Sequence, residues 1–117
     1  MRDPRERLRD ILEAISAIER YQPKDKIAFE RDEMLQVWFL RHLQIIGEAA
    51  RALSDEVRNL APDIPWAKII GMRNVLVHDY FDIDTEIVWD AVKRDIPMLK
   101  KAVETLLKKL KELGYGG

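Results

Sequence analysis

Residues 73–81, RNVLVHDYF, place an arginine, a histidine and a tyrosine at R-x4-H-x-Y spacing inside an otherwise apolar segment. On a helix, Arg73 shares the stripe of Trp66, Ile69 and Ile70, where a leucine would be the ordinary residue. An arginine side chain is always charged, so holding it against apolar residues is costly unless it is paired or reaches a polar pocket. The sequence therefore predicts an ion-pair partner for Arg73, a polar pocket beside it, or both.

An arginine and a histidine in one pocket suit the cleavage of RNA phosphodiester bonds without a metal ion. The imidazole of histidine titrates near neutral pH, so it can take the proton of a ribose 2′-hydroxyl or protonate the leaving oxygen. An arginine can hold the scissile phosphate through two hydrogen bonds and stabilise the charge that develops on it. Asn74 precedes His78 by four residues, and an amide at this spacing on a helix can fix the orientation of the ring.

Arg73 and His78 each leave an alternative open. Arg73 can instead serve an internal ion pair with a carboxylate such as Glu48, because buried arginines are usually paired. The single histidine of the motif is one short of an acid–base pair, and a symmetric dimer with two facing motifs would supply the second.

Helices must position these residues, because apolar residues recur every three or four positions and no segment alternates as a strand does. The predicted helices cover four stretches: 3–21, about 26–53, from 65 through the motif, and from 82 or 84 onward. Pro97 should kink or break the last of them. The chain is therefore predicted to be one all-α domain over residues 1–117, a bundle of four to five helices.

The helix expected over about 26–53 has two apolar faces. One carries Leu35, Trp38, Phe39, His42, Ile46, Ala49, Ala50 and Leu53. Val37, Leu40, Gln44 and Gly47 lie on roughly the opposite side. Two faces suggest two neighbours, so the second row is a candidate seam with another copy of the chain.

The composition excludes several classes of protein. With no cysteine, the chain has no disulfide, zinc–thiolate site or cysteine nucleophile. A net charge of −1 argues against charge-driven binding of nucleic acid and leaves room only for a local basic pocket. The charged stretch MRDPRERLRD is unlike a secretion signal, and no apolar run is long enough for a bilayer, so we expect a cytoplasmic protein without a membrane partner.

The sequence segments around the motif resemble those of a known protein family. GEAARAL, PDIPW and IIGMRNVLVHDYF, followed by VW and DIP, look like the HepT-like family of the HEPN superfamily over most of residues 35–99. R-x4-H-x-Y is that superfamily's ribonuclease signature.

The resemblance implies a HEPN-like helical domain that dimerises with its motifs facing across a cleft. It implies a ribonuclease toxin whose partner is a minimal nucleotidyltransferase antitoxin of the MntA type. By position, Arg73 and His78 become the catalytic pair, Asn74 the polar companion, and Tyr80 the residue that such antitoxins adenylylate. We expect no cofactor and no metal. The competing hypothesis is a non-catalytic subunit that uses the same pocket to bind a nucleotide or a nucleotidyltransferase.

Three further groups of polar residues have structural explanations. His42 lies on an apolar stripe, where a hydrogen-bonded histidine of the core or an interface is commoner than a catalytic one. The lysines at 100, 101, 108, 109 and 111 suit a solvated face better than an RNA-binding one. Capping of a helix start explains the acidic cluster of Asp79, Asp82, Asp84 and Glu86 better than a divalent cation does.

Overall fold

The structure, a computed structural model, describes residues 3–75 and 84–114, apart from the side chains of residues 74 and 75. His78 and Tyr80 lie outside the described residues. Every regular element within those ranges is helical, which confirms the all-α fold. The elements are α1 (Pro4–Arg20), α2 (Lys26–Glu30), α3 (Glu33–Arg51), α4 (Asp55–Asn59), α5 (Trp66–Val75), α6 (Thr85–Asp90), a π-helical turn (Ala91–Asp95) and α7 (Ile96–Glu112).

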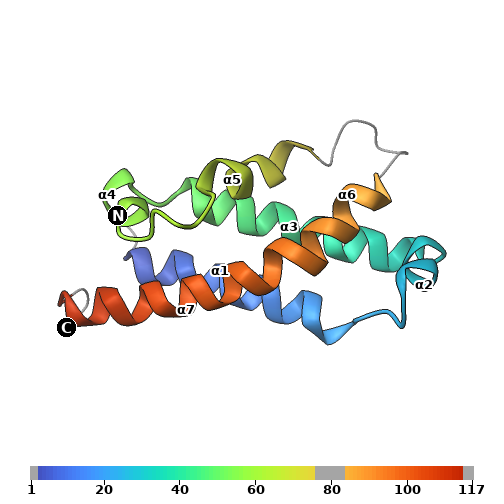
Figure 1. The fold of residues 1–117 in the computed structure, drawn as a ribbon, viewed down its shortest axis with the longest axis horizontal. Coiled ribbons are helices and arrows are strands. Elements are labelled where there is room, and N and C mark those ends of the chain that lie inside the picture. Colours follow the sequence, from blue (N-terminus) through green and yellow to red (C-terminus); the bar gives the residue numbers. More distant parts are fainter. Residues whose placement is uncertain (1–2, 76–83, 115–117) are drawn as a thin grey trace.

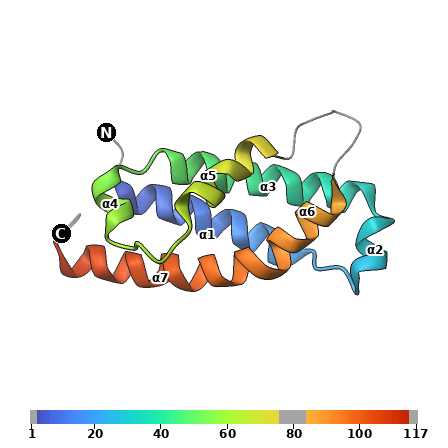
Figure 2. The same cartoon turned by 45° about the horizontal axis from the view of Figure 1, so that its top comes forward.

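The long helices form an up-and-down bundle with α1 and α3 at its centre (Figures 1 and 2). Helix α3 packs against α1 on one side and α5 on the other, and α7 packs along α1. The short helices α2 and α4 lie at opposite ends of the bundle, at the turns between the long helices. This order leaves α5, which carries Arg73, supported by α3.

The core is built from the apolar stripes of the long helices. Burial of such stripes, at roughly 25 cal/mol per Å² of apolar surface, is the main favourable contribution to folding. The stripe expected on the first helix is buried at four of its five positions, and Leu12 is half-buried. The largest fully buried side chains are Leu8, Ile11, Ile15 and Ile18 of α1, Phe29 of α2, Phe39, Leu43 and Ile46 of α3, Ile69 of α5, and Leu99, Leu106 and Leu110 of α7.

The expectation of one helix over about 26–53 is wrong, because α2 and α3 are separate helices. The break falls at Arg31 and Asp32. The carboxylate of Asp32 accepts a hydrogen bond of 3.0 Å from the backbone N–H of Leu35, so it caps the start of α3. Aspartate stabilises a helix start better than a helix interior, which explains why the apolar periodicity alone missed the break.

The expected kink or break at Pro97 takes the form of a π-helical turn, and the chain stays helical from Thr85 to Glu112. The π-helical turn Ala91–Asp95 directly precedes α7, and Pro97 occupies its first turn. The backbone N–H of Ile96 donates to the carbonyl of Ala91, five residues back, so the chain is wider here than a regular α-helix. Proline has no N–H to donate, and a first helical turn tolerates this loss.

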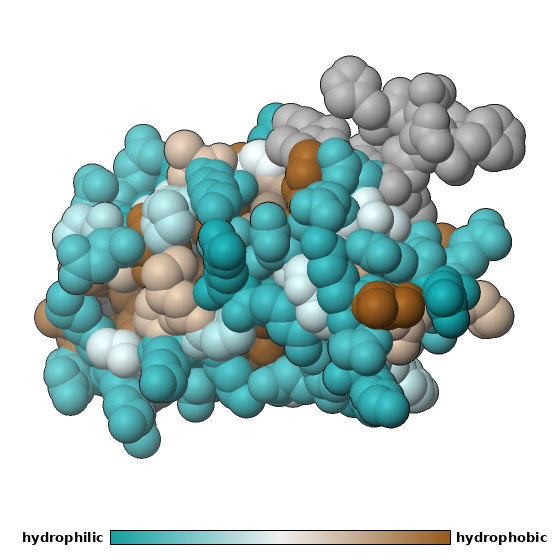
Figure 3. All heavy atoms as spheres, turned by 45° about the vertical axis from the view of Figure 1, so that its right-hand side comes forward, coloured by the Kyte–Doolittle hydropathy of each residue, from teal (hydrophilic) through white to brown (hydrophobic). Residues whose placement is uncertain are grey.

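Most of the surface shown in Figure 3 is hydrophilic, with apolar side chains in separate places. Such isolated apolar side chains are ordinary on a protein surface. Within residues 3–75 and 84–114, none of the helices is long and apolar enough to cross a bilayer.

Candidate functional site

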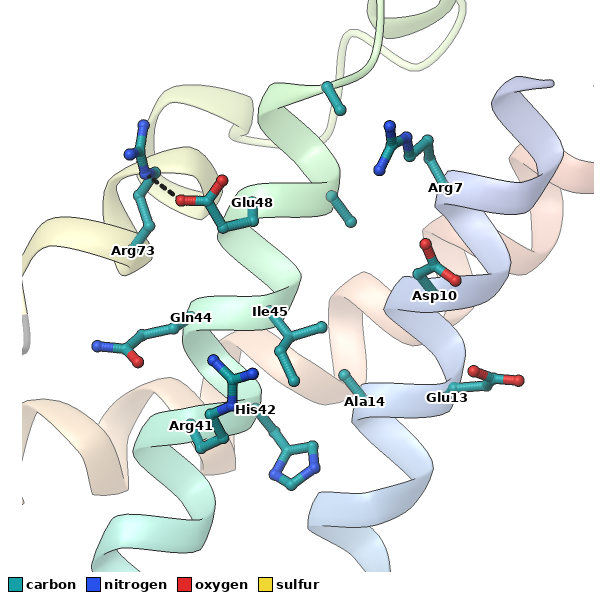
Figure 4. Close-up of a pocket in the computed structure, with 12 residues that line it drawn as sticks. Arg7, Asp10, Glu13, Ala14, Arg41, His42, Gln44, Ile45, Glu48 and Arg73 are labelled. Atoms are coloured by element: carbon teal, nitrogen blue, oxygen red, sulfur yellow. Dashed lines mark ion pairs between the residues drawn. The ribbon is translucent and has the colours of Figure 1, made fainter. Parts of the chain in front are cut away.

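Arg73 forms an ion pair between α5 and α3. Its Nε lies 2.6 Å from Oε1 of Glu48, with 27% of the arginine side chain and 57% of the glutamate side chain exposed. Figure 4 shows the two terminal nitrogens of Arg73 on the side of the guanidinium away from Glu48. The expected internal ion pair is therefore present, and it still leaves these donors directed away from the carboxylate. The planar guanidinium of an arginine fixed in this way suits an anion with two adjacent acceptor oxygens, such as a phosphate.

Gly47 lets the backbone of α5 approach α3 closely beside this pair. A Cβ atom added at Gly47 would lie 2.8 Å from the backbone nitrogen of Arg73 and 3.2 Å from the carbonyl oxygen of Ile69. Gly47 therefore faces a helix of its own chain, so its expected place in a dimer seam is wrong. Of the other residues in that row, Val37 is exposed and Leu40 is half-buried.

Replacing Gly47 with alanine should lower the free energy of unfolding by about 1–3 kcal/mol, because backbone atoms cannot yield as a flexible side chain can. Gly71→Ala is the matched control, since no heavy atom lies within 4 Å of a Cβ at that position. The control should raise the free energy of unfolding by about 0.5–1 kcal/mol through helix propensity. Urea denaturation measures both changes, and equal effects would contradict the close approach.

Arg73 lines an open groove of about 740 Å³ along the outer face of α3 (Figure 4). Helix α1 forms one wall, and Arg73 of α5 lies at the opposite wall. Small and apolar side chains contribute to the groove: Ala14, Ile45, Ala49 and Ala52. Its charged side chains are three arginines and three acids: Arg7, Arg41, Arg73, Asp10, Glu13 and Glu48. The sequence left room for a local basic pocket. The groove around Arg73 instead carries both positive and negative side chains.

His42 lines the same groove, and its ring is held in place by Trp38. The Nδ1 atom lies 2.7 Å from the carbonyl oxygen of Trp38, and the two ring centroids are 4.4 Å apart. Trp38 is held in turn by a hydrogen bond of 2.8 Å from its Nε1 to the carbonyl oxygen of Ala17. Because a carbonyl only accepts, Nδ1 of His42 must carry the hydrogen, and Nε2 is the other ring nitrogen available for interactions.

The expected hydrogen bond of His42 is therefore confirmed, but the side chain is half-buried at the groove and is not part of the core. Sequence reasoning missed that His42 and Arg41 share a groove with Arg73. A sequence signal was present, since Arg41, Ile45, Glu48 and Ala52 recur every three or four residues on the helix. The groove itself, however, depends on where α1 and α5 pack.

The other residues assigned by sequence are only partly described. Asn74 belongs to α5, but its side chain is outside the described residues, as are His78 and Tyr80. Of the motif residues, Arg73 is the one whose side chain is described, and it lies beside Glu48 in the groove.

The described members of the acidic cluster have structural partners. Asp84 caps α6, accepting hydrogen bonds of 3.1 and 3.2 Å from the backbone N–H groups of Glu86 and Ile87. A hydrogen bond of 2.6 Å from Lys26 to Glu86 raises the pKa of that lysine. Among the described residues, no three His, Asp or Glu side chains are grouped as metal ligands.

The expected lysine face near the C-terminal end is exposed at four of its positions, and Lys100 is half-buried. Lys100 Nζ lies 3.0 Å from Oε2 of Glu19, and Lys109 donates a hydrogen bond of 2.9 Å to the carbonyl oxygen of Leu60. These contacts tie α7 to α1 and to the end of α4.

Comparisons with known proteins cover nearly the whole chain. The model of the family described as "Ribonuclease HepT-like" matches residues 11–106. A protein of Methanocaldococcus jannaschii named "Putative RNase MJ1380" is 40% identical over 88% of this chain and 95% of its own length. The "Probable ribonuclease HepT" of Thermococcus cleftensis is 40% identical over 92% of this chain and 98% of its own length. No solved structure gives a significant match. The chain belongs to the HepT-like ribonuclease family.

Proposed function

We propose that this protein is a metal-independent endoribonuclease that uses Arg73 and His78 as its catalytic pair, with Asn74 as the polar companion of His78. The observation that carries this proposal is the Arg73–Glu48 ion pair, which fixes an arginine in an open groove with two donors directed away from Glu48. Membership of the HepT-like ribonuclease family and the names of the relatives support the same activity.

The reaction needs one proton removed and one proton returned. His78 takes the proton of the ribose 2′-hydroxyl, the 2′-oxygen attacks phosphorus, and the bond to the 5′-oxygen breaks. The terminal nitrogens of Arg73 stabilise the charge on the phosphate oxygens as this occurs. A second imidazolium donates a proton to the 5′-oxygen, so the products are a 2′,3′-cyclic phosphate and a 5′-hydroxyl.

The second imidazole is His78 of another copy in a symmetric homodimer whose two motifs face each other. This composite site follows from the single histidine of the motif and is the arrangement that the family resemblance implies. We expect light scattering of the purified protein at tens of micromolar to give the mass of two chains. A monomer under these conditions, still active on RNA, would contradict the composite site.

The partner of the enzyme is a minimal nucleotidyltransferase antitoxin of the MntA type, and the two form a toxin–antitoxin pair in the cytoplasm. Tyr80 is the residue that the antitoxin adenylylates. A nucleotide on the tyrosine two residues after His78 would place bulk and negative charge close to where the RNA phosphate must enter. Occlusion and repulsion then act in the same direction, so modification silences the enzyme.

Incubation with ATP, magnesium and the nucleotidyltransferase should add one adenylyl group to Tyr80 and abolish RNA cleavage. Peptide mass spectrometry locates the group, and circular dichroism should show an unchanged helical content. Tyr80→Phe is the control, because it keeps the ring and removes the hydroxyl. Inhibition of this variant as complete as that of the wild type would show that the antitoxin acts by covering the site.

Cleavage of RNA by the purified protein in excess EDTA tests the ribonuclease proposal. The competing hypothesis, a non-catalytic subunit that binds a nucleotide or a nucleotidyltransferase, predicts binding without any cleavage. Adding the nucleotidyltransferase without ATP controls for an activity that needs the partner. Absence of cleavage in both conditions would contradict the proposal.

A further inference from the structure

We propose that Arg41 and His42 form a second subsite of the groove, which binds the RNA strand at a phosphate beyond the one that Arg73 holds. The proposal rests on the proposed ribonuclease function and adds a requirement on the substrate. RNA must extend beyond the cleaved bond, along α3, to be bound fully.

The positions of these residues on α3 separate the two subsites. His42 precedes Glu48, the partner of Arg73, by six residues, which corresponds to about 9 Å along a helix. One phosphate group is too small to contact both the ring of His42 and the Arg73–Glu48 pair, and the guanidinium of Arg41 extends into the interval between them (Figure 4). The groove nevertheless joins them, because Arg41, His42, Glu48 and Arg73 all line it.

His42 is ready to bind without reorganisation. Its contacts with Trp38 hold the ring, and the hydrogen bond at Nδ1 fixes which nitrogen carries the hydrogen. Nε2 therefore accepts a hydrogen bond from a ribose hydroxyl when the ring is neutral and donates one to a phosphate when it is protonated. A ligand that binds a fixed side chain avoids the entropic cost of ordering it.

Arg41 supplies the charge at this subsite. Its side chain is exposed, and it makes no hydrogen bond or ion pair with any residue in the described ranges. In Figure 4 its guanidinium extends along α3 toward the end where Glu48 lies. An arginine without a partner in a groove can bind a phosphate without first breaking another ion pair.

The charges on the two walls guide the strand. The α1 wall contributes Arg7, Asp10 and Glu13, a formal charge of −1. The opposite side contributes Arg41, Arg73 and Glu48, a formal charge of +1, and the ring of His42 lies between α3 and α1 (Figure 4). An RNA backbone that follows α3 from Arg73 to Arg41 stays beside the two arginines and away from the exposed Glu13 of α1.

Binding of an uncleavable oligonucleotide tests the subsite without relying on catalysis. A fluorescent RNA of several nucleotides, 2′-O-methylated at every position, is titrated with the wild type and with Arg41→Gln, and anisotropy gives the Kd. The variant should bind about tenfold more weakly, as expected for loss of a hydrogen bond to a charged group. The dependence of log Kd on log salt concentration should become less steep by about 0.7.

Arg51→Gln is the matched control, since Arg51 is an exposed arginine on the same helix and does not line the groove. If Arg41→Gln and Arg51→Gln raised the Kd equally, the effect would reflect only the loss of one positive charge from the protein, and the proposal would be overturned. His42→Phe, which keeps an aromatic ring beside Trp38, is tested with unmethylated RNA on a His78→Ala background, so that the ribose hydroxyls are present and the RNA stays intact. It should weaken binding about threefold relative to His78→Ala alone. Unchanged binding by this variant would remove His42 from the subsite.

Substrate length provides the second test. With cleavable RNA, Arg41→Gln should raise KM for an oligonucleotide about tenfold and leave kcat and the KM for a dinucleotide unchanged. An equal rise for both substrates would contradict a separate subsite. Failure of the wild type to cleave any RNA contradicts the proposed function instead, and the anisotropy titration still decides the subsite.

Discussion

Replacing Arg73 with lysine is expected to lower kcat for RNA cleavage by about 10²- to 10³-fold, the usual cost of losing one transition-state donor. Lysine keeps the positive charge but has no planar fork, so it cannot pair with Glu48 through one nitrogen and present two others to a phosphate. Because the lost contact strengthens in the transition state, kcat should fall far more than KM rises. Single-turnover cleavage of an end-labelled RNA measures the chemical step.

The loss should occur without unfolding. The Arg73–Glu48 pair is partly exposed, so its contribution to the free energy of unfolding is at most about 1 kcal/mol. Glu48→Gln is the matched variant, because it removes the charge that holds Nε and leaves Arg73 itself in place. It should lower kcat less than Arg73→Lys does. Cleavage by Arg73→Lys within a few fold of the wild type would show that Arg73 serves only the packing of α5 on α3.

Replacing His78 with alanine is expected to lower kcat by about 10²- to 10⁴-fold, the range measured for loss of a general acid or base. In the proposed symmetric dimer, this one substitution removes both the group that takes the 2′-hydroxyl proton and the group that protonates the 5′-oxygen. The effect should therefore fall at the upper end of that range. Circular dichroism and light scattering check that the helices and the dimer remain.

His42→Ala is the control for that experiment, since His42 is the other histidine of the chain. Its loss should affect KM for longer RNA and leave kcat within a few fold, because the proposal gives it a binding contact away from the reacting atoms. A larger fall in kcat for His42→Ala than for His78→Ala would show that His42, and not His78, is the acid–base group.

The sequence predicted the helices well where the apolar period was unbroken and a cap was visible. Asp3 and Pro4 marked the start of α1, and Pro97 marked the region where a π-helical turn leads into α7. The separation of α2 from α3 was missed although residues 30–33 are all charged and interrupt the apolar positions there. The carboxylate of Asp32 caps the start of α3 at this position. Capping is a local effect, and the spacing of apolar residues carries no information about it.

The candidate site was predicted in part. Its ion pair could be proposed from sequence, because an arginine on an apolar stripe needs a carboxylate and Glu48 lies on another apolar helix. The role of Gly47 could not be predicted from sequence, because its close approach to Arg73 depends on how α5 packs on α3. The same holds for the groove, whose walls come from helices far apart in the sequence.

Analysis of the RNA ends produced in excess EDTA tests the central claim most directly. The purified protein is incubated with a defined RNA, and the products are identified by mass spectrometry. Cleavage through Arg73 and His78 predicts a 2′,3′-cyclic phosphate on one product and a 5′-hydroxyl on the other, with neither formed by His78→Ala. Cleavage that requires magnesium, or products with 3′-hydroxyl and 5′-phosphate ends, would contradict the account.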